Sequence, residues 1–456
     1  MQKPLKIGNA QGFWGDSPEA PARLLKQQPD LDYLTLDYLA EISLSIMAVQ
    51  REKDPEAGYA RDFLDVIRSL IPFWKEGSKV KIVTNAGGLN PKGCAQACAK
   101  ILQEASLPLR VGVVSGDDVL EIIKSNPNEA LCNNLDNNTP MRDMQGTLAT
   151  ANAYIGAKPI AEAVQMGADI IITGRVTDPS LTVGPCAAYY NWHWNDYDKL
   201  AGATIAGHLI ECGTQATGGI WTHWLELCDP VNIGFPVVEV NQDGSCVLTK
   251  PPQTGGAVNL QVVKEQLLYE IGDPDNYLSP DVTVSFLSLQ LEQIAQDRVL
   301  IKGAKGKAPP STLKVSATYR DGYKAEGILA LYGNQVCEKA ASCGEIILKK
   351  VKLAGYDLER TCIESIGCGD LVPGITHGRK CAVPMECMLR VCVADKKYEA
   401  VECFVKEIAS MVTSGPQGVT GYTSGRPHIR PIYAFWPCRI EPSKVNPKVE
   451  IIEVKS

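Results

Sequence analysis

The sequence lacks long apolar runs. No stretch approaches the roughly 18–20 consecutive apolar residues that a membrane-spanning helix needs, and segment 1–8 lacks the apolar stretch of a secretory signal. Basic residues are not in surplus either, because 45 lysines and arginines stand against 52 aspartates and glutamates, a net charge of −7. Binding nucleic-acid phosphates requires clustered positive charge. We therefore expect a cytoplasmic protein with neither a membrane nor a nucleic-acid partner.

Several well-known catalytic and cofactor motifs are also absent. The chain contains no G-x-G-x-x-G or Walker A phosphate loop, no G-x-S-x-G elbow and no H-E-x-x-H pair. Its 16 cysteines include no C-x-x-C motif and no zinc-finger or ferredoxin spacing. We expect most of them to be reduced, buried packing residues.

A chain of 456 residues predicts two or three domains. Along roughly the first 225 residues, strand-like apolar runs alternate with helix-like stretches, which indicates a parallel sheet covered by helices. The predicted strands are Leu5–Ala10, Tyr33–Leu39, Val80–Thr84, Arg110–Ser115 and Asp169–Thr173. The predicted helices are Ala20–Gln28, Glu41–Glu52, Ala60–Lys75, Lys92–Ala105 and Ala149–Met166. The fold class expected for residues 1–228 is therefore α/β, Rossmann-like and doubly wound.

The composition changes after this region, because turn signals multiply and helices become fewer. Val237–Val240 and Cys246–Thr249 flank an Asp-Gly turn and predict a hairpin. A second turn is expected at Arg320–Tyr323. We predict a smaller α+β domain with a mixed or antiparallel sheet over residues 229–413, and a C-terminal segment, 414–456, that wraps back on the body.

Polar residues follow each predicted strand of the first domain. In open α/β sheets, ligands bind at the edge where the carboxyl ends of the strands meet. Gly87 and Gly88 could form an anion cradle before a helix or only a tight turn. We expect seven residues near this edge and assign them to substrate binding: Asn9, Asn85, Gly87, Gly88, Asn90, Arg175 and Asp178.

Candidate acid–base groups lie at the same edge. Asp37 and Glu41 follow the second strand, where two carboxylates could divide acid and base roles or hold a divalent metal, although an acid in the first turn of a helix is stabilising by itself. Arg175 suits a bidentate contact with a carboxylate or phosphate, or an ion pair with Asp178 within its own loop. His208 and Cys212 are four residues apart and so share a helix face. They could act as base and nucleophile, bind a metal, or only pack.

Longer segments of the chain form a recognisable series, and together they resemble the acyclic terpene utilisation (AtuA) family from about residue 5 to 437. The segments are Thr84–Pro91, Asn152–Ala157, Gly167–Asp178, Gly207–Gly213 with Gly218 and Gly219, and Ser414–Gly418. The resemblance implies a role in the breakdown of branched isoprenoid acids as coenzyme A thioesters. It also implies an additional ferredoxin-like domain in some relatives, which a separate subunit could supply here.

We predict an enzyme that acts on a branched acyl-CoA or related carboxylate by lyase or hydratase-type chemistry. Asp37, Glu41 or His208 would move protons, and Arg175 would clamp an anionic group. Coenzyme A would enter only as part of the substrate, and no other cofactor is expected, although a divalent metal is possible. The alternatives are a non-catalytic subunit or scaffold paired with a ferredoxin-like partner, and a metal-dependent hydrolase or lyase. We also expect a homo-oligomer.

Overall fold

The computed structural model describes residues 2–376 and 384–455. By contacts the chain divides into two compact units. The first unit comprises Met1–Thr318 and Phe435–Ser456, and the second unit comprises Tyr319–Ala434. The fold is mixed α/β, with a mixed sheet in the first unit and an antiparallel sheet in the second.

A run of parallel strands forms the centre of the first unit. All five predicted strands are confirmed, and the three isoleucines of the fourth strand in this run are fully buried. Strands this apolar on both faces require helices on each side of the sheet. In sheet order the strands are β1 (Leu5–Asn9), β2 (Tyr33–Leu36), β3 (Lys81–Thr84), β6 (Ile170–Thr173) and β4 (Arg110–Ser115).

Helices connect these strands, and four of the five predicted ones are confirmed. The prediction of one helix over Ala149–Met166 is wrong, because its first part is strand β5 (Leu148–Ala153), which pairs with β14 (Leu313–Tyr332). Small residues such as those of β5 suit either conformation, so pairing with a distant strand decides between them. The helices are α1 (Ala20–Gln27), α2 (Glu41–Lys53), α3 (Phe63–Lys75), α4 (Pro91–Glu104), α5 (Leu120–Ser125), α6 (Lys158–Gln165), α7 (Ser180–Tyr190), α8 (Tyr197–Glu211) and α9 (Leu260–Leu268).

Antiparallel strands extend the parallel run on both sides. The predicted hairpin is confirmed as β7 (Val237–Val240) and β8 (Cys246–Thr249), and β7 pairs with β1. Because these strands join the first sheet, the first unit continues to Thr318, whereas the composition change had suggested a boundary near residue 228. The other added strands are β12 (Arg298–Lys302) and β11 (Gln290–Ala295) beyond β8, and β19 (Lys448–Glu453) beside β4. A small separate sheet contains β13 (Lys305–Lys307), β10 (Thr283–Ser285) and β9 (Tyr277–Leu278).

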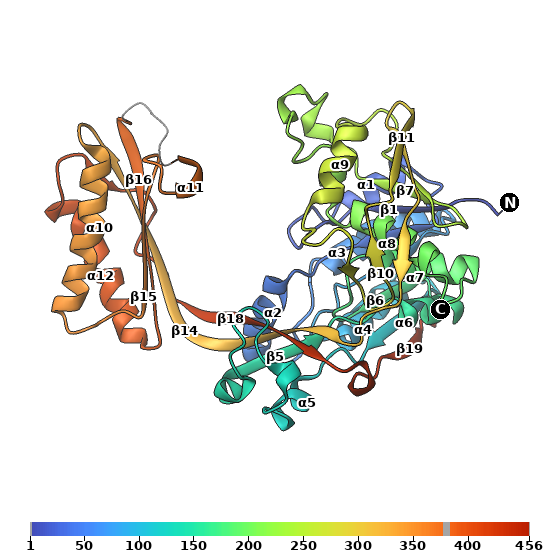
Figure 1. Ribbon diagram of the computed structural model, residues 1–456, viewed down its shortest axis with the longest axis horizontal. Helices are drawn as coiled ribbons and strands as arrows, with labels where there is room; N and C mark the ends of the chain where they lie inside the picture. Colours follow the sequence, from blue (N-terminus) through green and yellow to red (C-terminus); the bar gives the residue numbers. More distant parts are fainter. Residues whose placement is uncertain (1, 377–383, 456) are drawn as a thin grey trace. The chain divides into compact units, whose positions relative to one another are not determined.

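The second unit has a β-α-β-β-α-β order of main elements, the ferredoxin-like pattern. Its antiparallel sheet has the order β15-β16-β14-β17, and α10 and α12 pack together against one face (Figure 1). The predicted turn at Arg320–Tyr323 is wrong, because β14 continues through it. A separate ferredoxin-like subunit stays a prediction. The elements are α10 (Val336–Leu353), β15 (Arg360–Ile366), α11 (Pro373–Thr376), β16 (Glu386–Asp395), α12 (Tyr398–Ser414), β17 (Val419–Gly421) and β18 (Arg430–Ile440).

Two further sequence expectations concern cysteines and membranes. Cys337 and Cys368 form a disulfide, which the spacing of the cysteines did not predict. Most other cysteines that the structure describes are free and buried, as expected. Within residues 2–376 and 384–455, no helix combines the length and the apolar character required to cross a membrane.

Candidate functional site

The first unit contains a cavity of about 1270 Å³. Its wall includes the loops that follow β1, β2 and β6, so the cavity lies at the carboxyl edge of the parallel strands, as the sequence suggested. Gly12 allows this arrangement, because a Cβ atom there would lie 2.5 Å from the backbone carbon of Cys212. The volume exceeds the range of about 300–1,000 Å³ that is typical of small-molecule pockets. The cavity is therefore large enough for a bulky ligand.

Asp37 lines the cavity directly after β2 and is 6% exposed. Its Oδ1 atom accepts hydrogen bonds from Asn85 Nδ2 at 2.7 Å and from the Leu39 amide at 3.3 Å. Burial, followed by repulsion from Asp178, raises the pKa of Asp37 well above its ordinary value. Because Oδ1 is occupied as an acceptor, the proton of the neutral acid lies on Oδ2. The raised pKa favours this neutral form, which would be a hydrogen-bond donor at the wall of the cavity.

Arg175, which is buried, and Asp178, which is half-buried, form an ion pair in the loop after β6. Arg175 Nη1 donates to Asp178 Oδ1 at 2.5 Å, and the guanidinium lies 4.1 Å from the ring centroid of Tyr154. The backbone of this loop is held by Asp117, whose Oδ2 atom accepts from the Arg175 amide at 2.8 Å and from Asn152 Nδ2 at 2.8 Å. From the sequence, Arg175 could either bind an anionic group of the substrate or form a structural ion pair with Asp178. The geometry shows the pair and also places both side chains on the cavity wall.

Glu211, at the end of α8, is a second neutral acid. Its Oε1 atom lies 3.0 Å from His208 Nδ1, and His208 Nε2 lies 3.0 Å from the Gln266 carbonyl oxygen. Burial lowers the pKa of His208 to about 4, so the ring is neutral and carries one proton. The carbonyl can only accept, so that proton is on Nε2 and Nδ1 accepts from Glu211. This agrees with the pKa of Glu211, which burial and then Asp178 raise well above its ordinary value.

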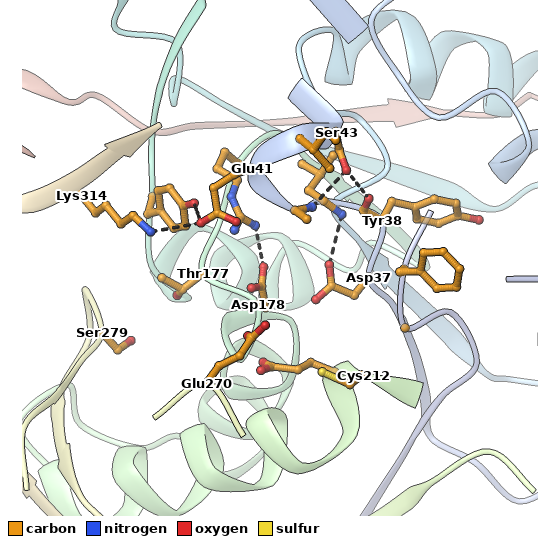
Figure 2. A pocket seen from close by; sticks show the side chains of 18 of the residues that line it. Asp37, Tyr38, Glu41, Ser43, Thr177, Asp178, Cys212, Glu270, Ser279 and Lys314 are labelled. Carbon is orange, nitrogen blue, oxygen red and sulfur yellow. Dashed lines mark hydrogen bonds and ion pairs between the residues drawn. The ribbon is translucent and has the colours of Figure 1, made fainter. Parts of the chain in front are cut away.

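Glu41, in contrast, is ionised. Its Oε1 atom accepts from the Tyr154 hydroxyl at 2.8 Å and from Lys314 Nζ at 3.1 Å (Figure 2). Burial opposes the negative charge, but Lys314 and the Tyr154 hydroxyl outweigh it and lower the pKa of Glu41 to about 2. Asp37 and Glu41 therefore occupy different electrostatic environments, as the sequence had suggested for this pair.

Carboxyl groups from separate elements share one side of the cavity. In Figure 2 the side chains of Asp37, Asp178 and Glu270 extend toward a common space, with Cys212 close by. Repulsion from Asp178 contributes to the raised pKa values of both Asp37 and Glu211. Burial raises the pKa of the Cys212 thiol far above neutrality, so the thiolate needed for nucleophilic attack is not favoured. The arrangement suits proton transfer.

Large apolar side chains surround these acids. Six of them line the cavity and yet are between 44% and 68% exposed. They are Phe13, Ile42, Ile46, Leu135, Ile220 and Leu278. We call this set the apolar rim. Apolar side chains that remain exposed around a concave site mark a surface that an apolar ligand covers.

Some predicted site residues lie behind the cavity wall. Asn85 holds Asp37, Asn90 accepts from the Gly93 amide at 2.9 Å as the N-cap of α4, and Asn9 Nδ2 donates to the Glu211 carbonyl at 3.1 Å. Gly87 and Gly88 form a buried turn, where a Cβ atom on Gly87 would lie 2.5 Å from the Thr173 carbonyl oxygen. His208 contacts Glu211 instead of the cavity. The structure thus brings Asp37, Glu41, Arg175 and Asp178 to one cavity and leaves the other predicted residues outside its lining.

Several lining residues were not singled out from the sequence. Glu211 lies three residues after His208 on the same helix face, so the i,i+3 spacing was a usable signal. Tyr154 lies in one of the segments that carry the family resemblance. Lys314 and Glu270 follow no local pattern, because tertiary contacts alone bring them to the cavity.

A metal centre was the remaining chemical alternative. Within residues 2–376 and 384–455, no group of three or more His, Cys, Asp or Glu side chains is arranged to hold a metal ion. Two of the proposed ligands are also engaged elsewhere, since Glu41 contacts Lys314 and His208 contacts Gln266.

Comparison with protein families gives a match over most of the chain. The family model of the acyclic terpene utilisation family protein AtuA matches residues 5–451, which is nearly the whole chain. Searches of the curated proteins and of the solved structures find no match. The matched range covers the parallel strands, the cavity and the second unit. The chain therefore belongs to the acyclic terpene utilisation family.

Proposed function

We propose that the cavity of the first unit is the active site of an enzyme that acts on a branched, isoprenoid-type acyl thioester or related carboxylate by hydratase or lyase chemistry. The observation that carries the proposal is one cavity that combines the apolar rim with Asp37, which Asn85 holds and whose pKa burial raises, and with the Arg175–Asp178 ion pair. Membership of the acyclic terpene utilisation family supports the substrate class.

The apolar rim would hold the hydrocarbon part of the substrate. Burial of each methylene or methyl group contributes about 0.8 kcal/mol to binding. A branched chain covers more rim surface near the reacting carbons than a straight chain does. The family membership and the exposed rim therefore point to the same ligand chemistry.

Asp37 would act on the carbonyl oxygen. Hydration of a double bond conjugated to a thioester, and cleavage of a Cα–Cβ bond, both pass through an enolate. The Asp37 Oδ2–H group can donate a hydrogen bond to that oxygen as its negative charge develops, and a neutral buried acid is suited to this role. Asn85 keeps Oδ1 occupied and so directs the proton to Oδ2.

Asp178 would act as the base in the hydration step. Its carboxylate takes a proton from water, the hydroxide oxygen bonds to the β-carbon, and the double-bond electrons move to the carbonyl oxygen. The same proton then passes to the α-carbon as the enolate collapses, which completes the addition of water. Arg175 holds Asp178 in place throughout. Gly87 and Gly88 do not line the cavity, so Arg439 and Lys314, which do, are the cations proposed to face the anionic part of the substrate.

The test compares Asp37→Asn with the wild-type protein. A branched unsaturated acyl-CoA and its straight-chain isomer are each incubated with the protein, and products are followed by mass spectrometry for gain of water or for cleavage. We expect turnover of the branched substrate, and a loss of about a hundredfold or more in kcat/KM in the variant. Asp65→Asn, on the exposed face of α3, is the matched control and should keep full activity. Unchanged turnover in the Asp37 variant, or no binding of either thioester by the wild type, would refute the proposal.

A further inference from the structure

The second unit has a groove of its own, of about 650 Å³, on its sheet. Residues alternate along β16, so that Leu389 and Val391 are buried in the core that contains residues of α10 and α12, while Arg390 and Cys392 face the other way. The groove lies over this second face and extends to the segment that leads into β18. The side of the sheet opposite α10 and α12 is therefore the polar one.

On this face, charged side chains of β14 and β15 lie opposite the same residues of β16 and so form rows across the three strands. Lys324 of β14 and Arg360 of β15 both lie opposite Ala394 of β16. The small alanine side chain leaves space between the two cations. In the next row, Glu326 and Cys362 both lie opposite Cys392.

Basic side chains outnumber acidic ones around the groove. Among the described residues of the lining, Glu326 is the one acid, and it pairs with Arg390, which also contacts Glu364. Arg360 pairs with Asp321 at 2.8 Å. The basic lining residues are Lys324, Arg360, Arg390, Arg426 and Arg430, with His428 beside them.

Three of these cations differ from Arg360 and Arg390, which each form an ion pair. For Lys324, Arg426 and Arg430 no ion pair exists within the described part of the chain, and both arginines are exposed. The whole protein carries a net charge of −7, so this groove is a local excess of positive charge. Such a concentration in a concave site favours an anion.

We propose that this groove is a binding site for a small anion that carries two or more phosphate charges. Guanidinium groups bind phosphate oxygens with paired hydrogen bonds, and the Thr423 and Ser424 hydroxyls in the lining add neutral donors. Among the described lining residues His428 is the one aromatic ring, whereas sheet faces that bind single-stranded nucleic acids carry several aromatic side chains for stacking. The phosphates belong either to a free inorganic anion or to a nucleotide such as the one in coenzyme A.

Calorimetry on the full chain tests the site with inorganic pyrophosphate, ADP, coenzyme A and a single-stranded oligonucleotide. We expect pyrophosphate to bind, and the Arg426→Gln/Arg430→Gln double variant to bind it at least about tenfold more weakly. Lys349→Gln/Lys352→Gln removes the same charge from exposed positions of α10 and should bind as the wild type does. Tighter binding of ADP or coenzyme A than of pyrophosphate supports the site and identifies a nucleotide as the source. If ADP and coenzyme A bind with affinities similar to that of pyrophosphate, the site recognises the phosphates alone, and a free anion is the source.

Cysteine footprinting provides a readout that does not depend on the variants. Cys362 lines the groove and is exposed, whereas exposed Cys228 lies in the first unit outside it. Bound pyrophosphate should slow alkylation of Cys362 and leave Cys228 unchanged. The proposal is overturned if no phosphate compound binds, if the two double variants bind equally, if both cysteines respond alike, or if the oligonucleotide binds more tightly than every small anion.

Discussion

His208 sets a measurable part of the acid stability of the first unit. Burial lowers its pKa from 6.5 to about 4 in the folded protein. As the pH falls through this window, the unfolded chain takes up a proton that the folded protein does not, so stability is lost on acidification and is complete again only above about pH 6.5. At about 1.4 kcal/mol for each pKa unit, the loss is about 3 kcal/mol. His208→Gln removes this titration, because glutamine can still donate to the Gln266 carbonyl without binding a proton.

The assay is urea unfolding at several pH values between neutral and about pH 4. His208→Gln will lower stability at neutral pH through lost packing, so the readout is the difference between the two pH profiles. We expect the variant to lose about 3 kcal/mol less than the wild type on acidification. His223→Gln, which removes an exposed imidazole that also contacts a glutamate at 3.0 Å, is the matched control variant. Parallel profiles for His208→Gln and the wild type would show that His208 is not a buried neutral base.

Three further predictions follow from the same structure. Glu211→Gln should change the unfolding free energy at neutral pH by less than about 1 kcal/mol, because an amide replaces a neutral acid, whereas a loss of about 3–5 kcal/mol would show that Glu211 and His208 are a charged pair. Burial raises the pKa of Asp281 to about 6, so the folded protein binds this proton more tightly than the unfolded chain does. The contribution of the proton to the unfolding free energy, about 3 kcal/mol, is therefore complete below about pH 3.8 and is lost as the pH rises through 6. Asp281→Asn should remove that loss in urea titrations, and an unaltered profile would contradict the assignment. Cys337→Ser breaks the disulfide with Cys368 and should lower the stability of the second unit by about 2–4 kcal/mol in hydrogen exchange, whereas unchanged exchange rates would contradict this.

Local patterns predicted the elements of the first unit well. The β-branched run at Ile170–Thr173 and the polar residues after each strand were sufficient to predict which edge of the parallel sheet holds the cavity. Local patterns were less informative where two conformations suit the same residues. Leu148–Ala153 is a strand because it pairs with β14, and β14 continues through the expected turn into its pairing with β16, which begins at Tyr323. Both outcomes depend on partners that are distant in the sequence.

The sequence by itself determined the alternation of strands and helices and the order of polar residues at the strand ends, because side-chain period and β-branching act over a few neighbouring residues. Only the tertiary structure decided which polar groups reach the cavity. Asp37 and Gly87 both follow buried strands, yet Asp37 lines the cavity while Gly87 is packed against the Thr173 carbonyl. The pKa shifts were likewise a tertiary outcome, since burial and the approach of Asp178 and Lys314 from separate elements raise the pKa values of Asp37 and Glu211 and lower that of Glu41.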